Sequence, residues 1–179
     1  MRKKAGPAGS SLCNEVGCPI CALHDPLVTA GARPHRGSAF RESGCSFDVR
    51  FGSDHGCRFR LRLDAQDADY RRLPDAARTS KMCDFAAAAR RGREIRLLVV
   101  EIKKGPADRN VVDQLQAGLD LLHNHLPQGT KPALPDAYLV AGSQTAQLKH
   151  ILRSRPRPLR FDHFRVAPRV HRCGDGIEF

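Results

Sequence analysis

Apolar and polar residues alternate in two segments of the N-terminal half of the chain. In residues 45–51 the apolar side chains fall on one face, and residues 57–63 repeat the pattern with arginine on the other face. A period of two is typical of a half-buried β-strand. The glycine-containing link at residues 52–56 has the composition of a turn. The pattern therefore predicts two strands joined as a hairpin.

Two further strands are expected at residues 82–89 and 95–103. The second contains the uninterrupted apolar run 97–100, which is typical of a central strand covered on both faces. A two-residue turn at Gly92-Arg93 would make these strands antiparallel neighbours. In that register the numbers of paired residues add up to 185.

The most regular pattern in the chain predicts a helix over residues 108–126. Pro106 and Asp108 mark its start. Its apolar side chains recur at helical spacing, at Val111, Val112, Leu115, Leu119, Leu122 and Leu126. The remaining expectations are a polar loop with one short helical turn at 64–80, a strand at 137–141, a helix at 145–152 and a last strand at 161–170.

This order of elements indicates an α/β or α+β fold, in which helices flank a central mixed sheet of four or more strands. With 179 residues, the chain has the length of one domain and a short appendage. Residues 1–38 are rich in glycine, proline, cysteine and basic residues and show no clear period. We therefore expect an arm or a small metal-bound knuckle at 1–38, and the main domain at 39–179.

The charge of the chain points to a polyanionic partner. Thirty basic residues outweigh 19 acidic ones, and 23 of the basic residues are arginine, whose planar fork suits bidentate contact with phosphate. Nucleic acid is the expected partner, with a general solubility charge as the alternative. Aromatic residues are only 6% and tryptophan is absent, so open platforms for base stacking are not expected.

The sequence contains no apolar run long enough to span a membrane, and no apolar signal core follows the basic start. A cytoplasmic location is therefore expected. Seven cysteines is an odd number, which favours reduced thiols or metal ligands over a disulfide framework.

The predicted register places two acidic residues against each other. Asp84 would lie directly opposite Glu101, and Lys103 would share the face of Glu101. Two opposed carboxylates in an apolar sheet are unfavourable unless a positive charge lies between them, and a hard divalent cation is the usual solution. Such a cation can polarise a phosphoryl oxygen, while a lysine ammonium can position the attacking water. The constellation therefore predicts phosphodiester hydrolysis.

Asp84, the apolar run 97–100 and the sequence Glu101-Ile102-Lys103 resemble the motif of the PD-(D/E)XK, or restriction-endonuclease-like, nuclease superfamily. The resemblance covers about residues 40–142 and implies an α-β-β-β-α-β core. It also implies that Asp84 and Glu101 bind Mg²⁺ or Mn²⁺ and that Lys103 assists the water nucleophile.

The same resemblance suggests two further site residues. Many members place a glutamine on the helix after the E-x-K strand, and Gln114 fits this position better than Gln116. An acidic residue on a preceding helix often completes the site, and Glu42 is the best candidate. The chain lacks a proline before Asp84, and it has Gly118 where some branches place an aromatic residue.

Each of these residues also has a simpler interpretation. Glu101 and Lys103 could form the solvated end of a strand, with Asp84 as an edge residue paired with Lys81 or Arg90. The glutamines could be ordinary surface residues of the helix, and Glu42 an exposed loop acid.

A second constellation, in the N-terminal segment, has the spacing C-x4-C-x2-C-x2-H. Its members are Cys13, Cys18, Cys21 and His24. Zinc takes four thiolate or imidazole ligands in a tetrahedron, and a close C-x2-C pair can grip it. Because four ligands within twelve residues is compressed, one or two could instead come from Cys45, Cys57 or His35. The alternative is an arm with free thiols.

A third feature is a basic loop with four arginines in eight residues, Arg153, Arg155, Arg157 and Arg160. Interleaved prolines would keep it extended along a phosphate backbone, although a solvated loop is the alternative.

The leading hypothesis is thus a Mg²⁺-dependent nuclease that cuts DNA, in restriction, repair or defence against phage. The competing hypothesis is a non-catalytic nucleic-acid-binding module with a nuclease fold, or a subunit of a homodimer or heteromer that needs its partner for activity.

Overall fold

The structure is a computed structural model, and it describes residues 12–13, 15–53, 56–64, 82–103, 110–142, 145–154 and 158–179. Every structural statement below concerns these residues. The expected loop at 64–80, except for Asp64 itself, lies outside them, as do the first residues of the helix expected at 108–126. Lys81, Arg155 and Arg157 also lie outside the described residues.

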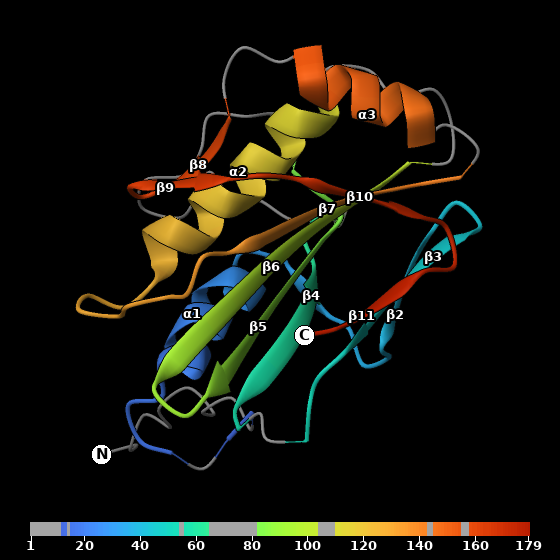
Figure 1. The fold of residues 1–179 in the computed structure, drawn as a ribbon. Coiled ribbons are helices and arrows are strands. Elements are labelled where there is room, and N and C mark those ends of the chain that lie inside the picture. Colours follow the sequence, from blue (N-terminus) through green and yellow to red (C-terminus); the bar gives the residue numbers. More distant parts are fainter. Residues whose placement is uncertain are drawn as a thin grey trace, which may run out of the picture.

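Three helices and eleven strands are arranged as Figure 1 shows. The helices are α1 (Pro19–Thr29), α2 (Asn110–His125) and α3 (Thr145–Ser154). The strands are β1 (Arg33–Pro34), β2 (Ala39–Glu42), β3 (Cys45–Arg50), β4 (Arg58–Arg62), β5 (Phe85–Arg91), β6 (Glu94–Lys103), β7 (Asp136–Ala141), β8 (Leu159–Phe161), β9 (Phe164–Val166), β10 (Arg169–Arg172) and β11 (Gly176–Glu178).

A six-stranded mixed sheet in the order β1-β4-β5-β6-β7-β10 forms the centre of the molecule. Strands β4, β5 and β6 are antiparallel neighbours, whereas β7 runs parallel to β6 and β10 runs parallel to β7. A smaller sheet, β11-β3-β2, packs against the central strands. The prediction of an α+β fold around a mixed sheet of four or more strands is confirmed.

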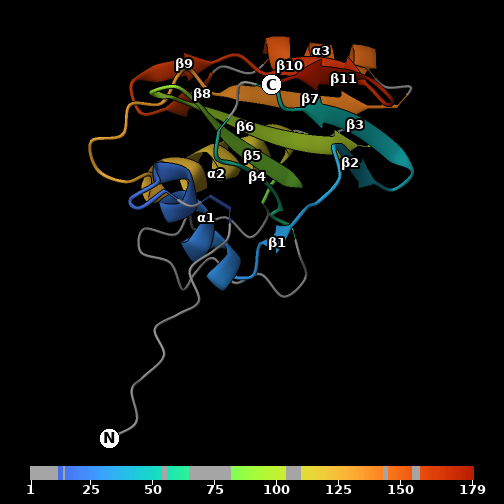
Figure 2. The same ribbon diagram turned by 90° about the horizontal axis from the view of Figure 1, so that it is seen from below.

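Both faces of the central strands are covered. Helices α1 and α2 lie side by side against one face (Figure 2), where they share an apolar core with Leu97 and Val99. The small sheet closes the other face over Leu98 and Val100. The uninterrupted apolar run of β6 is therefore buried on both sides, as predicted. Strand β5 between these layers is built from alanine, and its residues 86–89 are fully buried.

The predicted register of the β5–β6 hairpin is confirmed. Phe85 pairs with Val100 and Arg91 with Glu94, so that paired numbers add up to 185. Gly92 occupies the turn with a φ of 59°, a left-handed conformation that glycine adopts without strain.

The predicted hairpin between residues 45–51 and 57–63 is wrong. Strand β3 pairs with β2 and β11 in the small sheet, whereas β4 pairs with β1 and β5 in the central sheet. The physical reason lies just upstream of β3. Ser43 and Gly44, with φ of 50° and 78°, form a tight two-residue turn that brings β2 back onto β3. The two sheets are tied by Arg60, which donates to the carbonyl of Val49.

The expectation that residues 1–38 lack regular structure is wrong for residues 19–29. These form α1, in which Ile20, Leu23 and Leu27 are fully buried in the core. Their spacing is helical and Pro19 occupies the first position of the helix, but Pro26 lies inside the helix and the side chain of Cys18 does not cap its start.

The C-terminal half follows the predictions up to α3. Helix α2, strand β7 and helix α3 lie where they were expected. The expected strand at 161–170 is divided: Asp162 adopts a φ of 55° in a turn that folds β9 back onto β8, and β10 instead pairs with β7 in the central sheet. Strand β11 was not expected. Among the described residues, no helix has the length and apolar character needed to cross a membrane.

The burial of α1 can be tested by truncating one of its core side chains. Leu23→Ala should lower the free energy of unfolding by about 2–5 kcal/mol, because the cavity would lie inside the shared core. Val16→Ala is the matched control, since Val16 is fully exposed. Denaturant titration measures both. Equal stability of the two variants would contradict the packing of α1.

Candidate functional site

Asp84 and Glu101 meet at one end of the central sheet, as the register predicts. Asp84 directly precedes β5, and Glu101 lies near the end of β6. The amide of Ile102 donates to Oδ2 of Asp84 at 2.6 Å, and the amide of Asp84 donates to Oε2 of Glu101 at 3.1 Å. Each carboxylate is thus held by the backbone of the neighbouring strand.

Both carboxylates are withdrawn from solvent, with exposed fractions of 6% for Asp84 and 0% for Glu101. The side chain of Lys103 is partly exposed and extends to the carboxylate pair, where its Nζ lies 2.6 Å from Oε1 of Glu101. Apart from Lys103, no residue that the structure describes bonds this buried oxygen. A solvated strand end does not fit this burial, so that interpretation is contradicted.

Burial and mutual repulsion disfavour ionisation of this pair. Loss of hydration raises the pKa of Glu101, the charge of Asp84 raises it further, and Lys103 opposes both effects. Burial likewise raises the pKa of Asp84, while the hydrogen bond from Ile102 opposes the rise. A positive charge added between the carboxylates would stabilise both as anions.

The two glutamines of α2 have different surroundings. Gln114 is buried at 9% exposure and donates to the carbonyl of Met82 at 3.2 Å, two residues before Asp84. Gln116 instead bonds both backbone groups of Arg160 and so holds β8 against α2. Neither is an ordinary surface residue, and only Gln114 contacts the segment that carries Asp84.

Gly118 allows α2 to approach this segment closely. A Cβ atom at this position would collide with Sγ of Cys83 and come within 3.1 Å of Cγ1 of Val99. Gly118 therefore lets α2 pack directly against Cys83, the residue before Asp84.

Glu42 is placed on strand β2, so the expectation of a residue on a helix is wrong. Its Oε2 accepts a hydrogen bond from Arg62 at 2.6 Å. It still lies near enough to Asp84 for its charge to contribute to the raised pKa of that carboxyl. Glu42 belongs to the surroundings of the site, and its role in catalysis stays a prediction.

Two charged residues beside the site escaped the sequence analysis. Asp64 pairs with Arg62 at 2.7 Å, and its charge also raises the pKa of Asp84. Arg62 and Asp64 lie near Asp84 because β4 pairs with β5, and the amide of Leu63 between them donates to the carbonyl of Asp84. The alternation in residues 57–63 predicts the strand that ends beside these two residues. Its neighbour at this end is β5, and not the strand at 45–51 that the sequence pattern favoured.

The basic loop is described only at its two sides. Arg153 is exposed near the end of α3, and Arg160 is exposed on β8 with its backbone fixed by Gln116. Arg155 and Arg157, the other two arginines of the loop, lie outside the described residues.

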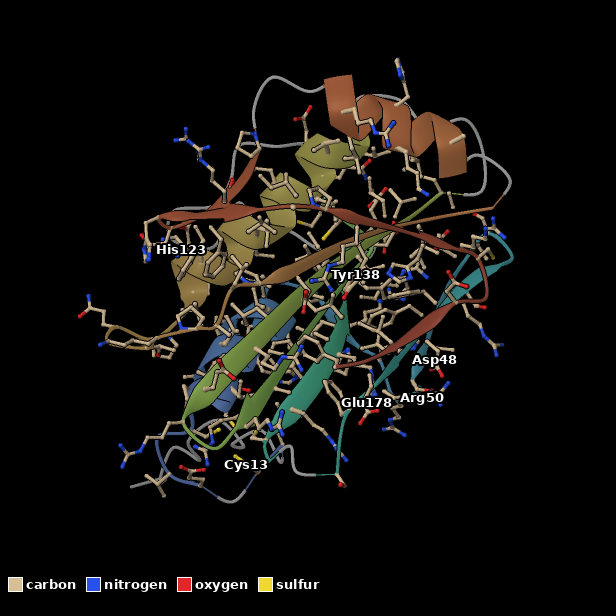
Figure 3. The ribbon with its side chains drawn as sticks, viewed as in Figure 1. Cys13, Asp48, Arg50, His123, Tyr138 and Glu178 are labelled. Carbon is tan, nitrogen blue, oxygen red and sulfur yellow. The ribbon has the colours of Figure 1, made fainter. Side chains whose placement is uncertain are left out.

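Four cysteines converge at the opposite end of β4. The sulfurs of Cys13, Cys18, Cys21 and Cys57 all lie within 4.8 Å of one another, an arrangement that could hold a metal ion. Figure 3 labels Cys13 beside the end of the sheet where the β5–β6 hairpin turns. His24 is not in the cluster, which corrects the predicted ligand set.

The side chain of His24 has other partners. Its Nδ1 lies 3.0 Å from Oδ1 of Asp25, and its ring packs against Phe59 with centroids 5.4 Å apart. One turn of α1 beyond Cys21, the histidine points to the core. The fourth member of the cluster is Cys57, one of the alternative ligands that the sequence suggests, because β4 lies beside α1.

Comparisons of the chain with models of protein families, with curated proteins and with solved structures found no match.

The close packing at Gly118 generates a double-mutant test. Gly118→Ala should lower the free energy of unfolding by about 1–3 kcal/mol, because the added methyl group overlaps Cys83. In the Cys83→Ala background the same change should cost less, since the sulfur is gone. Denaturant unfolding of the four proteins measures the coupling. An equal cost in both backgrounds would refute the contact.

Proposed function

We propose that the chain is a metal-dependent phosphodiesterase that hydrolyses nucleic acid, with Asp84, Glu101 and Lys103 as its catalytic residues. The observation that carries the proposal is the buried carboxylate pair, in which Asp84 and Glu101 lie together at the end of the sheet and Lys103 contacts Oε1 of Glu101. Buried like charges at a sheet end are unfavourable for stability, so a function is a better reason for their presence.

The donor set fits Mg²⁺ or Mn²⁺. Both ions prefer oxygen ligands, and carboxylates from two strands supply them without any nitrogen or sulfur donor. Asp84 and Glu101 would hold the ion. A divalent cation there supplies polarisation of a phosphoryl oxygen and lowers the pKa of a water.

The chain's own residues would orient the reaction. Lys103 is partly exposed, and its ammonium can hold a water or an oxygen of the scissile phosphate. The backbone amides of Asp84 and Ile102 fix one oxygen of each carboxylate, which leaves Oδ1 of Asp84 and Oε1 of Glu101 as the oxygens that would bind the ion. Gln114 positions Asp84 from behind through the Met82 carbonyl, so we assign it a positioning role.

The order of elements also supports the proposal. Apart from β1, β2 and β3, which lie between α1 and β4, the elements follow one another in the order α1, β4, β5, β6, α2 and β7. This order is compatible with the α-β-β-β-α-β core that the resemblance to the restriction-endonuclease-like superfamily implies. We propose α1 as the first helix of that core.

DNA is the proposed substrate. The net charge of +11 and the 23 arginines favour a phosphate backbone as the partner. Restriction, repair and defence against phage are the settings that suit such an activity. The competing function, a binding module without catalysis, is favoured by one observation: the ammonium of Lys103 lies 2.6 Å from Oε1 of Glu101 and neutralises that carboxylate. We propose further that the cysteine cluster holds Zn²⁺.

The catalytic proposal predicts a specific pattern in two variants. Asp84→Asn removes one charge with little change of shape, so Mg²⁺-dependent cleavage of plasmid DNA should fall by several orders of magnitude while DNA binding in EDTA holds or tightens. Lys103→Ala should also abolish cleavage but should weaken binding slightly, because it removes a positive charge near the phosphate.

The matched control is Asp162→Asn, the same substitution in the exposed turn between β8 and β9, which should cleave as the wild type does. Wild-type protein that binds DNA equally in EDTA and Mg²⁺ and never cuts it would favour the binding module. Cleavage that survives Asp84→Asn would contradict the assigned site.

The basic surface can be tested separately through its salt dependence. If Arg160 contacts phosphate, Arg160→Ala should weaken DNA binding and reduce the slope of log K against log salt by about 1. Arg50→Ala is the control, since Arg50 is as exposed but lies on the small sheet beside Asp48 (Figure 3). Fluorescence anisotropy over a salt series measures both slopes. An unchanged slope for Arg160→Ala would show that Arg160 does not contact phosphate and is an ordinary solvated residue.

A further inference from the structure

Four thiols from three separate segments converge on one point. Cys13 precedes α1, Cys18 and Cys21 lie at the start of α1, and Cys57 directly precedes β4. Three of these residues are close in sequence, whereas the fourth, Cys57, follows β2 and β3 in the chain. Folding therefore brings Cys57 to a knuckle that the N-terminal segment forms.

The sulfur–sulfur distances fit a single tetrahedral ion. Cys13 and Cys21 lie 3.3 Å apart, Cys21 and Cys57 lie 3.6 Å apart, and all four sulfurs lie within 4.8 Å of one another. Four thiolates around zinc, with bonds of about 2.3 Å, stand about 3.8 Å apart. An iron–sulfur cluster would spread the same thiolates farther, because it binds them through different iron atoms.

We propose that Cys13, Cys18, Cys21 and Cys57 bind one Zn²⁺ ion and that this ion is structural. Four thiolates fill all positions of the tetrahedron, which leaves none for a substrate or a water. The site also lies away from the carboxylates: Cys57 stands at the start of β4, where its carbonyl accepts from Arg90, whereas Asp84 bonds Leu63 just after the other end of that strand.

The ion would replace the capping that α1 lacks. Cys18 is the N-cap residue of α1, and among the described residues no side-chain capping hydrogen bond is formed there. The positive end of the helix dipole favours negative charge at this position, and zinc-bound thiolates supply it. Arg90 and Glu15 add an ion pair beside the cluster. Zinc would thereby fasten α1 to β4 and hold one wall of the core against the central sheet.

The test uses the full chain purified without chelator. Elemental analysis should find about one zinc per chain, and the Co²⁺-substituted protein should show the intense thiolate-to-cobalt absorption and visible bands of a tetrahedral four-sulfur site. Removal of zinc by a chelator should lower the melting temperature by roughly 10 °C or more, because metal binding and folding are coupled.

Three variants identify the ligands. Cys57→Ser should lose zinc or bind it much more weakly, whereas His24→Gln and Cys173→Ser should keep one zinc per chain. Should Cys57→Ser fail to fold, the cobalt spectrum of the wild type still distinguishes four sulfur ligands from three sulfurs and one imidazole. Zinc well below stoichiometry, iron in its place, or loss of zinc in His24→Gln would overturn the proposal.

This test is independent of the proposed catalysis. If the protein holds zinc but cuts no DNA, the structural zinc site stands and the nuclease proposal fails. If it cuts DNA but holds no zinc, the nuclease proposal stands and the zinc site fails.

Discussion

The antiparallel register of β5 and β6 is the constraint on which the rest of the structure depends. It places Asp84 opposite Glu101, and the two residues then exchange contacts, each carboxylate accepting from an amide of the other's strand. A shift of β6 by one residue would turn Glu101 to the opposite face of the sheet from Asp84. The Gly92 turn and the apolar layers on both faces hold this register in place.

The layers explain why the charged pair can be so deeply buried. The helices close one face of the sheet and the small sheet closes the other. The carboxylates lie at the end of β6 where Lys103, which is partly exposed, follows Glu101 by two residues. The close approach of α2 depends on Gly118, and the start of α1 at the other end of β4 depends on the cysteine cluster. One end of the sheet thus carries the proposed chemistry and the other a proposed structural metal.

Local patterns in the sequence were sufficient to predict the β5–β6 register, the opposition of Asp84 and Glu101, and helix α2 with Gln114. Each depends on a short segment and one turn. Non-local pairing could not be predicted in the same way: β4 was assigned to β3, Asp64 was missed in consequence, and Cys57 was only one of three alternative ligands. Helix α1 was missed because an internal proline and the absent cap obscure its pattern. The nuclease role itself stays a proposal.

The most direct test of the central claim is whether the carboxylate pair binds a divalent cation. Mn²⁺ can be titrated into chelator-treated protein while electron paramagnetic resonance follows the free ion. The account predicts one Mn²⁺ site per chain that Mg²⁺ displaces and that Glu101→Gln abolishes, with Glu94→Gln as an exposed control on the same strand. No uptake of Mn²⁺ by the wild type at millimolar concentration, or equal uptake by Glu101→Gln, would contradict it.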